Sequence, residues 1–153
     1  MFAVTKKRKK ACELVVVFLG GCMGTAARDA LSHAYPAAAG AFPLTTFAIN
    51  LAGSLALGFL LESLLFLGKD EGWLKTARLG LGTGLCGGFT TYSAFIVETD
   101  RLISDGSWIG WSYALASVVL GIACAWLGIK LARSLFTLRP FPGRRDSRKG
   151  GMQ

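Results

Sequence analysis

One segment of the sequence, GLCGGFTTYSAF, combines the residue types best suited to ion chemistry. It carries the hydroxyls of Thr90, Thr91 and Ser93, and two aromatic rings, Tyr92 and Phe95, lie three residues apart. Within a membrane, non-helical backbone persists only where it is buried in protein or lines a cavity. Its freed carbonyls suit a hard cation, and its freed amides suit an anion. The segment contains no acidic residue, so it favours an ion site over a proton relay or a divalent-metal catalytic site.

Further polar residues stand inside apolar runs, where an unsatisfied polar group is costly. Asn50 is flanked by Ile49 and Leu51, and two interpretations stay open: an interhelical hydrogen bond or a place on a pore wall. Tyr113 and Ser117 are four residues apart, and a glycine continues the same helical stripe. That stripe suits either an ion path or a tight helix contact.

The elements that position these residues must be membrane helices. Only 17% of the 153 residues are charged, 52% are hydrophobic and 20 are glycine, which excludes an ordinary soluble domain and is common in close-packed membrane helices. Four apolar spans of sufficient length follow one another, at 11–31, 44–67, 73–103 and 108–136. Glycines at 80, 82, 84, 87 and 88 make an uninterrupted third helix improbable.

Basic residues are distributed unevenly between the segments that alternate across the bilayer. Of the 17 lysines and arginines, all but Arg28 and Arg101 belong to the N-terminus, the connection between the second and third spans, and the tail. The positive-inside rule therefore predicts that both termini lie in the cytoplasm of a multi-pass cell-membrane protein. The net charge of +8 follows this orientation pattern and does not predict nucleic-acid binding. The expected parts are a basic N-terminus (1–10), a four-helix transmembrane channel domain (11–136) and a disordered basic tail (137–153).

Four motifs in order resemble the CrcB/Fluc family of fluoride channels over roughly residues 14–135. They are GGCMGTAARD, INLAGSLALG, GTGLCGGFTTYSAF and the Tyr-x-x-x-Ser-x-x-x-Gly stripe. The resemblance implies an all-α membrane protein with four transmembrane helices, the third broken mid-membrane, assembled as an antiparallel, dual-topology dimer. It further implies passive export of fluoride through two pores, with no catalysed reaction, and a structural Na⁺ at the dimer centre that is not transported.

The resemblance also implies which residues form the site. The backbone carbonyls of Gly87 and Thr90 from both subunits hold the sodium ion, and Asn50 offers its amide to fluoride. The ring edges of Tyr92 and Phe95 face the ion path, and such edges carry the positive side of the ring quadrupole. The other implied positions are Ser93 between the rings, Tyr113 and Ser117 along the fourth span, and Arg28 as a fixed positive charge at a pore mouth.

The chain departs from the family pattern at several points. Tyr92 replaces the usual phenylalanine, Ala94 replaces a threonine, and Gly121 stands where the fourth span has its third hydroxyl. The charge bias is a larger departure, since an antiparallel homodimer requires one chain to insert both ways. The assembly is therefore either a homodimer or a heterodimer with an oppositely oriented homologue, and the charge bias favours the heterodimer.

Two rival functions explain less of the sequence. A small multidrug-resistance exporter couples protons to export through a membrane-embedded glutamate, but Glu13 follows the basic cluster by three residues and Glu62 lies toward the end of its span. Both are more simply interfacial. A non-transporting anchor subunit would not require the irregular GGFTTYS segment.

Overall fold

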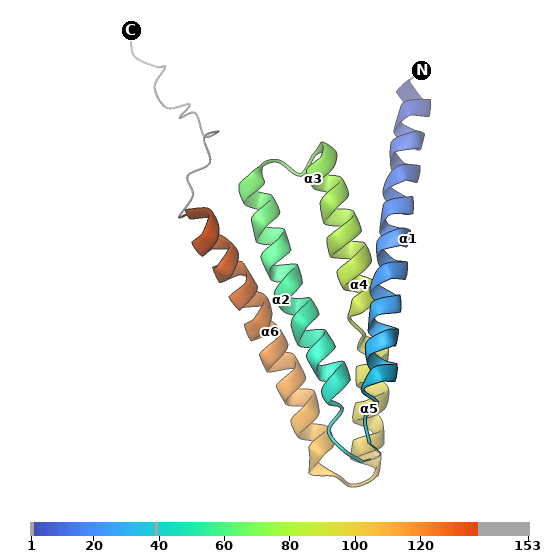
Figure 1. The fold of residues 1–153 in the computed structure, drawn as a ribbon, viewed down its shortest axis with the longest axis vertical. Coiled ribbons are helices and arrows are strands. Elements are labelled where there is room, and N and C mark those ends of the chain that lie inside the picture. The colour runs from blue at the N-terminus through green and yellow to red at the C-terminus, as the bar shows by residue number, and fades with distance from the viewer. Residues whose placement is uncertain (1, 39, 138–153) are drawn as a thin grey trace.

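The computed structural model describes residues 2–38 and 40–137, and every regular element in them is helical (Figure 1). The elements are α1 (Phe2–Ala34), α2 (Leu44–Leu67), α3 (Gly72–Ala77), the π-helical η1 (Arg78–Cys86), α4 (Gly87–Phe89), α5 (Tyr92–Ser104) and α6 (Trp108–Thr137). The elements α3, η1 and α4 run on without interruption and, together with α5, form the third of four helices. The predicted all-α class with a broken third helix is thus confirmed.

Three helices of the described part are long and apolar enough to cross a membrane. These candidate spans are Lys9–Ala34, Leu44–Leu67 and Trp108–Thr137, with mean hydropathies of 1.5, 1.8 and 2.0. A crossing helix needs about 20 apolar residues. The third helix is divided instead, and α5 has only 13 residues. The protein is therefore a multi-pass membrane protein with three candidate spans, and its third helix consists of two helical pieces.

The helices at the two ends of the predicted domain 11–136 can be compared with the structure. Helix α1 begins at Phe2, so it already includes the basic cluster that precedes the apolar run. Helix α6 ends at Thr137. The rest of the predicted disordered tail lies outside the described residues.

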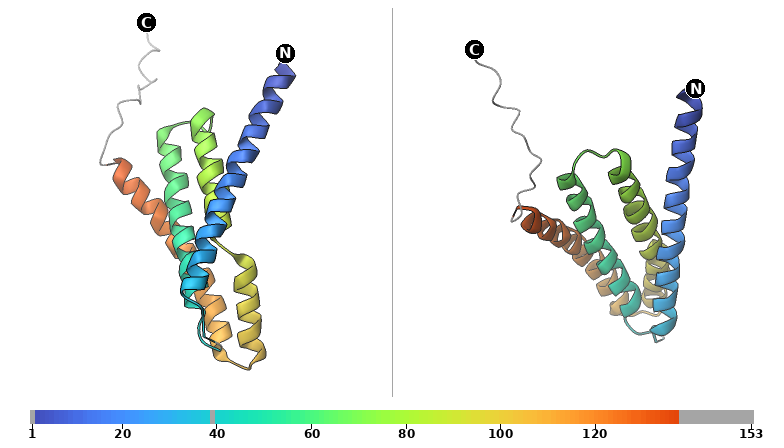
Figure 2. Two further views of the ribbon diagram at one scale, coloured as in Figure 1. Left: turned by 45° about the vertical axis from the view of Figure 1, so that its right-hand side comes forward. Right: turned by 45° about the horizontal axis from the view of Figure 1, so that its top comes forward.

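The helices alternate in direction, with α2 and the third helix between α1 and α6 (Figures 1 and 2). The start of α1, the α2–α3 connection and the end of α6 lie at one end of the bundle, and the other two connections lie at the opposite end (Figure 1). Helix α5 packs against α6 near that opposite end (Figure 2). Most basic residues of the described part therefore belong to segments at one end of the bundle.

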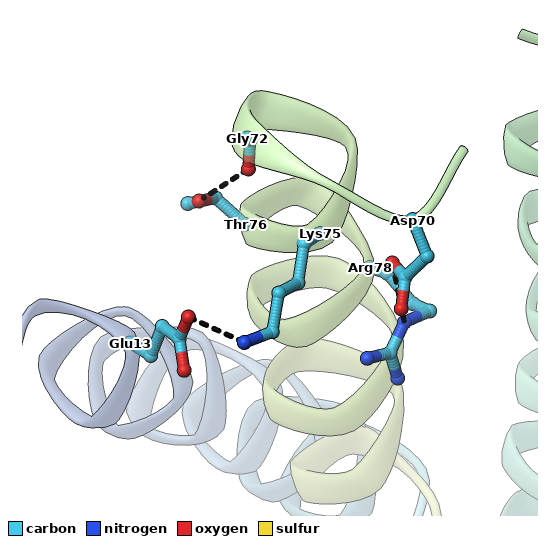
Figure 3. Close-up of polar contacts among 6 residues, drawn as sticks. All are labelled: Glu13, Asp70, Gly72, Lys75, Thr76 and Arg78. Carbon is cyan, nitrogen blue, oxygen red and sulfur yellow. Dashed lines mark hydrogen bonds and ion pairs between the residues drawn. The ribbon is translucent and has the colours of Figure 1, made fainter. Parts of the chain in front are cut away.

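Three acidic residues at this basic end are paired with cations. The Lys75 ammonium donates to Glu13 Oε1 at 2.6 Å and ties α3 to α1, and Arg78 Nε donates to Asp70 Oδ1 at 3.0 Å (Figure 3). In the same region Arg133 Nε donates to Glu62 Oε1 at 2.8 Å. The two glutamates that a proton-coupled exporter would need are thus held in ion pairs toward the end of the bundle.

Close backbone contact between α1 and the third helix depends on glycine. A Cβ atom added to Gly20 would collide with the Gly80 carbonyl oxygen, and one added to Gly24 would collide with the Leu85 carbonyl oxygen. Helices approach this closely in membranes where small residues face each other. The α1 face of the third helix is therefore a backbone-to-backbone seam.

The break in the third helix lies within the predicted GGFTTYS segment, at its threonines and not at its glycines. Residues 80–88 stay helical, in a wide π-helical form up to Cys86, and the chain becomes extended only at Thr90 and Thr91. Glycine has a low helix propensity in isolation. Here its missing side chain admits the backbone of α1, and this packing keeps the segment helical.

Helices α2 and α6 run side by side in the same direction and also meet through glycine. A Cβ atom on Gly58 would collide with the Ala125 carbonyl oxygen, and one on Gly128 would collide with the Leu55 carbonyl oxygen. This contact fixes which residues of α2 and α6 lie at the same level, a register that matters for the site.

The α1 seam can be tested with two neighbouring glycines. We expect Gly24→Ala to lower the free energy of unfolding by about 1–3 kcal/mol, because the new methyl group overlaps backbone atoms that cannot move aside. The matched control is Gly21→Ala, whose methyl group would lie 4.0 Å from its nearest contact, the Gly84 carbonyl oxygen. Thermal unfolding of detergent-solubilised protein measures both variants. Equal unfolding midpoints would contradict the seam.

Candidate functional site

The site is built around a break in the third helix. Thr90 has a ψ of 158°, Thr91 has φ and ψ of −143° and 124°, and helix resumes at Tyr92. Thr91 caps the resumed helix, since its Oγ1 accepts a hydrogen bond from the Ala94 N–H at 3.2 Å. The break therefore carries its own N-cap.

Asn50 of α2 satisfies the extended backbone at this break. Its Oδ1 accepts a hydrogen bond from the Thr91 N–H at 2.8 Å, and its Nδ2 donates to the Thr91 carbonyl at 3.0 Å. One turn further along α2, Gly53 leaves room for the Thr90 methyl group. The interhelical role that was one of two interpretations of Asn50 is thus present in the structure.

The two carbonyls expected at a cation site are those whose usual helical donors are diverted. In a continuous helix the N–H of Thr91 would bond the Gly87 carbonyl, and the N–H of Ala94 would bond the Thr90 carbonyl. Those N–H groups bond Asn50 and the Thr91 hydroxyl instead. Gly87 is exposed, and a Cβ atom added there would meet nothing within 4 Å. The donor set therefore fits a hard cation.

Arg28 lies behind the break on the α1 side. Its Nε donates to the Gly88 carbonyl at 3.3 Å, and the Thr25 hydroxyl donates to the same oxygen at 3.4 Å. The guanidinium group thus contributes to pairing the interrupted backbone.

A groove of about 570 Å³ opens on the other side of the break, between α2, the third helix and α6. It is lined by Asn50, Gly53, Ser54, Leu57, Gly82, Thr83, Cys86, Gly87, Thr90, Thr91, Tyr92, Phe95, Ser117 and Val118. The centroids of the Tyr92 and Phe95 rings lie 6.1 Å apart. Within the described residues, Ser117 Oγ is buried without a hydrogen-bond partner. The groove therefore combines two aromatic rings, an amide and an unpaired hydroxyl.

The structure brings most of the predicted site residues together in this groove, but not all of them. Asn50, Gly87, Thr90, Tyr92, Phe95 and Ser117 line it. Arg28, Ser93 and Tyr113 are not among its lining residues. Ser93 is exposed, and its hydroxyl lies 3.3 Å from that of Thr91.

Tyr113 belongs to a buried polar cluster around Glu98, a residue that the sequence reasoning missed. The Tyr113 hydroxyl donates to Glu98 Oε2 at 2.8 Å, and the Thr46 hydroxyl donates to Glu98 Oε1 at 2.7 Å. The Tyr113 ring also packs against Phe95, with centroids 5.4 Å apart. The available signal was spacing, because Glu98 follows Phe95 by three residues and so shares its helix face.

Comparison with known proteins decides the family. A sequence model described as CrcB-like protein, Camphor Resistance (CrcB), matches residues 15–129. The chain belongs to the CrcB family. The matched residues include the break and every residue that lines the groove. Only α1 and α6 extend beyond them, at the two ends of the described part.

Several curated CrcB-family relatives are similar over most of their length. A protein of Cutibacterium acnes named fluoride-specific ion channel FluC 1 is 46% identical over 125 residues, which are 81% of this chain and 87% of that relative. FluC 2 of Leifsonia xyli subsp. xyli is 47% identical over 123 residues, 80% of this chain and 84% of the relative. FluC of Chlorobaculum tepidum is 40% identical over 121 residues, 78% of this chain and 94% of the relative.

The structural role of Asn50 predicts a loss of stability on its removal. We expect Asn50→Ala to lower the free energy of unfolding by about 1–3 kcal/mol, because both Thr91 backbone groups lose their partner away from water. Ser63→Ala is the control on the same helix, since the Ser63 hydroxyl bonds only the Phe59 carbonyl of its own helix. Thermal unfolding in detergent compares the two variants. A smaller loss for Asn50→Ala than for Ser63→Ala would show that the break does not depend on this amide.

Proposed function

We propose that this protein is a fluoride-specific ion channel that lowers cytoplasmic fluoride by passive export down its electrochemical gradient. The observation that carries the proposal is the groove at the helix break, where donor groups and aromatic rings meet in a chain whose relatives are named fluoride-specific ion channels. A small, strongly hydrated anion crosses a membrane only where protein groups replace its water. No reaction is catalysed, so the rate of fluoride flux depends on the shape of the path and on its affinity for fluoride.

The groove offers fluoride three kinds of positive contact. An amide nitrogen carries two N–H donors, and Asn50 uses one of them on the Thr91 carbonyl, which leaves the second for the anion. The edges of Tyr92 and Phe95 carry the positive part of the ring quadrupole. The buried, unpaired Ser117 hydroxyl donates from α6. Phe95 also touches Tyr113, so the Glu98 cluster positions a pathway ring from behind.

A structural sodium ion is part of the same proposal. The carbonyls of Gly87 and Thr90 would hold it, two from each chain, because their helical donors are engaged elsewhere. When bound, the ion supplies positive charge where the partial negative charges of two broken helices meet. It is structural and is not transported.

The proposal includes an antiparallel dimer. Gly87 is exposed on a single chain, and a second chain would both cover it and complete the carbonyl set. The charge bias favours a fixed orientation with both termini in the cytoplasm, and hence a heterodimer with an oppositely oriented homologue. A homodimer is the alternative assembly, and the two differ in whether this chain ever inserts the other way.

Fluoride efflux from proteoliposomes tests the channel proposal. We expect vesicles that contain this chain, alone or with a homologous partner, to release fluoride faster than empty vesicles. Phe95→Ile should slow release by about threefold to tenfold, because an aromatic contact contributes ~0.5–1.5 kcal/mol and ~1.4 kcal/mol is a factor of ten. Phe66→Ile is the control, since Phe66 stacks on Phe136 away from the groove. Release no faster than from empty vesicles would refute the proposal, and equal slowing by both variants would refute the assignment of Phe95.

Insertion of the chain on its own tests the fixed orientation. We expect a C-terminal reporter that works only in the cytoplasm to be fully active, and one that works only outside to be inactive, because fifteen of the 17 basic residues lie in segments on one side. Cell fractionation measures the amount of each fusion in the membrane. Comparable activity from both reporters would establish dual insertion and favour the homodimer.

A further inference from the structure

We propose that Ser54 is an anion-contacting residue that supplies, from α2, the hydroxyl donor that α6 lacks at Gly121. This inference rests on the proposed fluoride-channel function and adds one residue to its pathway. Ser54 follows Asn50 by four residues, so the two share one face of α2, and both line the groove at the helix break.

The parallel contact between α2 and α6 places Ser54 opposite Gly121. A Cβ atom added to Gly121 would have Ser54 Oγ as its nearest neighbour, at 3.8 Å. One turn earlier on α6 is Ser117, whose buried hydroxyl has no partner in the described part of the chain. Residues one helical turn apart on α2 and α6 thus lie at two successive levels along the groove. Asn50 and Ser117 belong to the first level, and Ser54 faces glycine at the second.

The Ser54 hydroxyl lacks the intrahelical bond that two other helical serines of this protein make. Ser63 donates to the Phe59 carbonyl at 2.7 Å and Ser32 donates to the Arg28 carbonyl at 2.9 Å, each within its own helix. Among the described residues Ser54 makes no such bond, although the Asn50 carbonyl stands one turn before it. A hydroxyl rotor can turn toward an ion without rearranging the backbone.

The surroundings of Ser54 make its hydroxyl matter for an anion. Beyond the first level, toward the basic end of the bundle, the groove is lined by apolar groups such as Leu57 and by Gly82. The exception on the third helix is the hydroxyl of Thr83. An anion in this stretch has given up its hydration water. Without a donor to replace that water, its burial in an apolar environment costs several kcal/mol. Ser54 supplies a hydrogen-bond donor to the anion between the break and the basic end.

Moving the hydroxyl from one helix to the other tests this role. Ser54→Ala should slow fluoride release from proteoliposomes by about tenfold, since a hydrogen bond to a charged group contributes ~1.5–3 kcal/mol. Adding Gly121→Ser should restore most of the flux, because the new side chain has room beside position 54 and faces the same point of the groove. Gly121→Ala in the same background should restore none. Ser63→Ala should leave the flux unchanged.

The outcomes separate this inference from the function on which it rests. Wild-type vesicles that release no fluoride would overturn the channel proposal and this inference with it. Normal wild-type flux together with normal Ser54→Ala flux would overturn the role of Ser54 alone. Equal recovery with alanine and serine at position 121, or recovery with neither, would assign Ser54 to helix packing and also overturn the inference. Unfolding midpoints of the variants should stay close to that of the wild type.

Discussion

The need to pair every backbone polar group away from water governs this structure. In hydrocarbon an open N–H or carbonyl group has no water to bond, and the third helix opens such groups at Thr91. The Asn50 amide closes two of them from α2. On the opposite side, Arg28 and Thr25 of α1 bond the Gly88 carbonyl. The break is therefore held from both neighbouring helices and is a defined feature of the fold.

Glycine packing makes these bonds geometrically possible. Where Gly20 and Gly24 meet the third helix, the backbones touch, and this contact brings the α1 side chains within reach of the break. The same principle joins α2 to α6 through Gly58 and Gly128. The glycine excess of the composition is thus used for close approach. Chain flexibility is not its purpose here, since the glycine run remains helical up to the threonines.

The groove follows from the same arrangement. Because the break is paired with α1 and α2, the carbonyls of Gly87 and Thr90 are left without their helical donors. The rings of Tyr92 and Phe95 line the groove on the open side of the break, together with Ser117. Asn50 maintains the break and also lines the groove, where the proposed channel gives its second N–H to the anion. Asn50 bonds the broken backbone from the groove wall, whereas Ser54 and Phe95 line the groove without bonding that backbone.

The sequence by itself determined the helical class and the second and fourth spans, because hydropathy is a local property. The resemblance of its motifs to a known family gave the family and pointed to Asn50, Tyr92, Phe95 and Ser117, which line the groove. The sequence placed the break within the GGFTTYS segment but did not show that the glycines 80–88 stay helical, because only packing against α1 keeps that run helical and leaves the break to Thr90 and Thr91. It also missed Glu98, whose carboxylate accepts hydrogen bonds from hydroxyls on two other helices, those of Thr46 and Tyr113. Contacts between distant segments decide such partners, and no single segment encodes them.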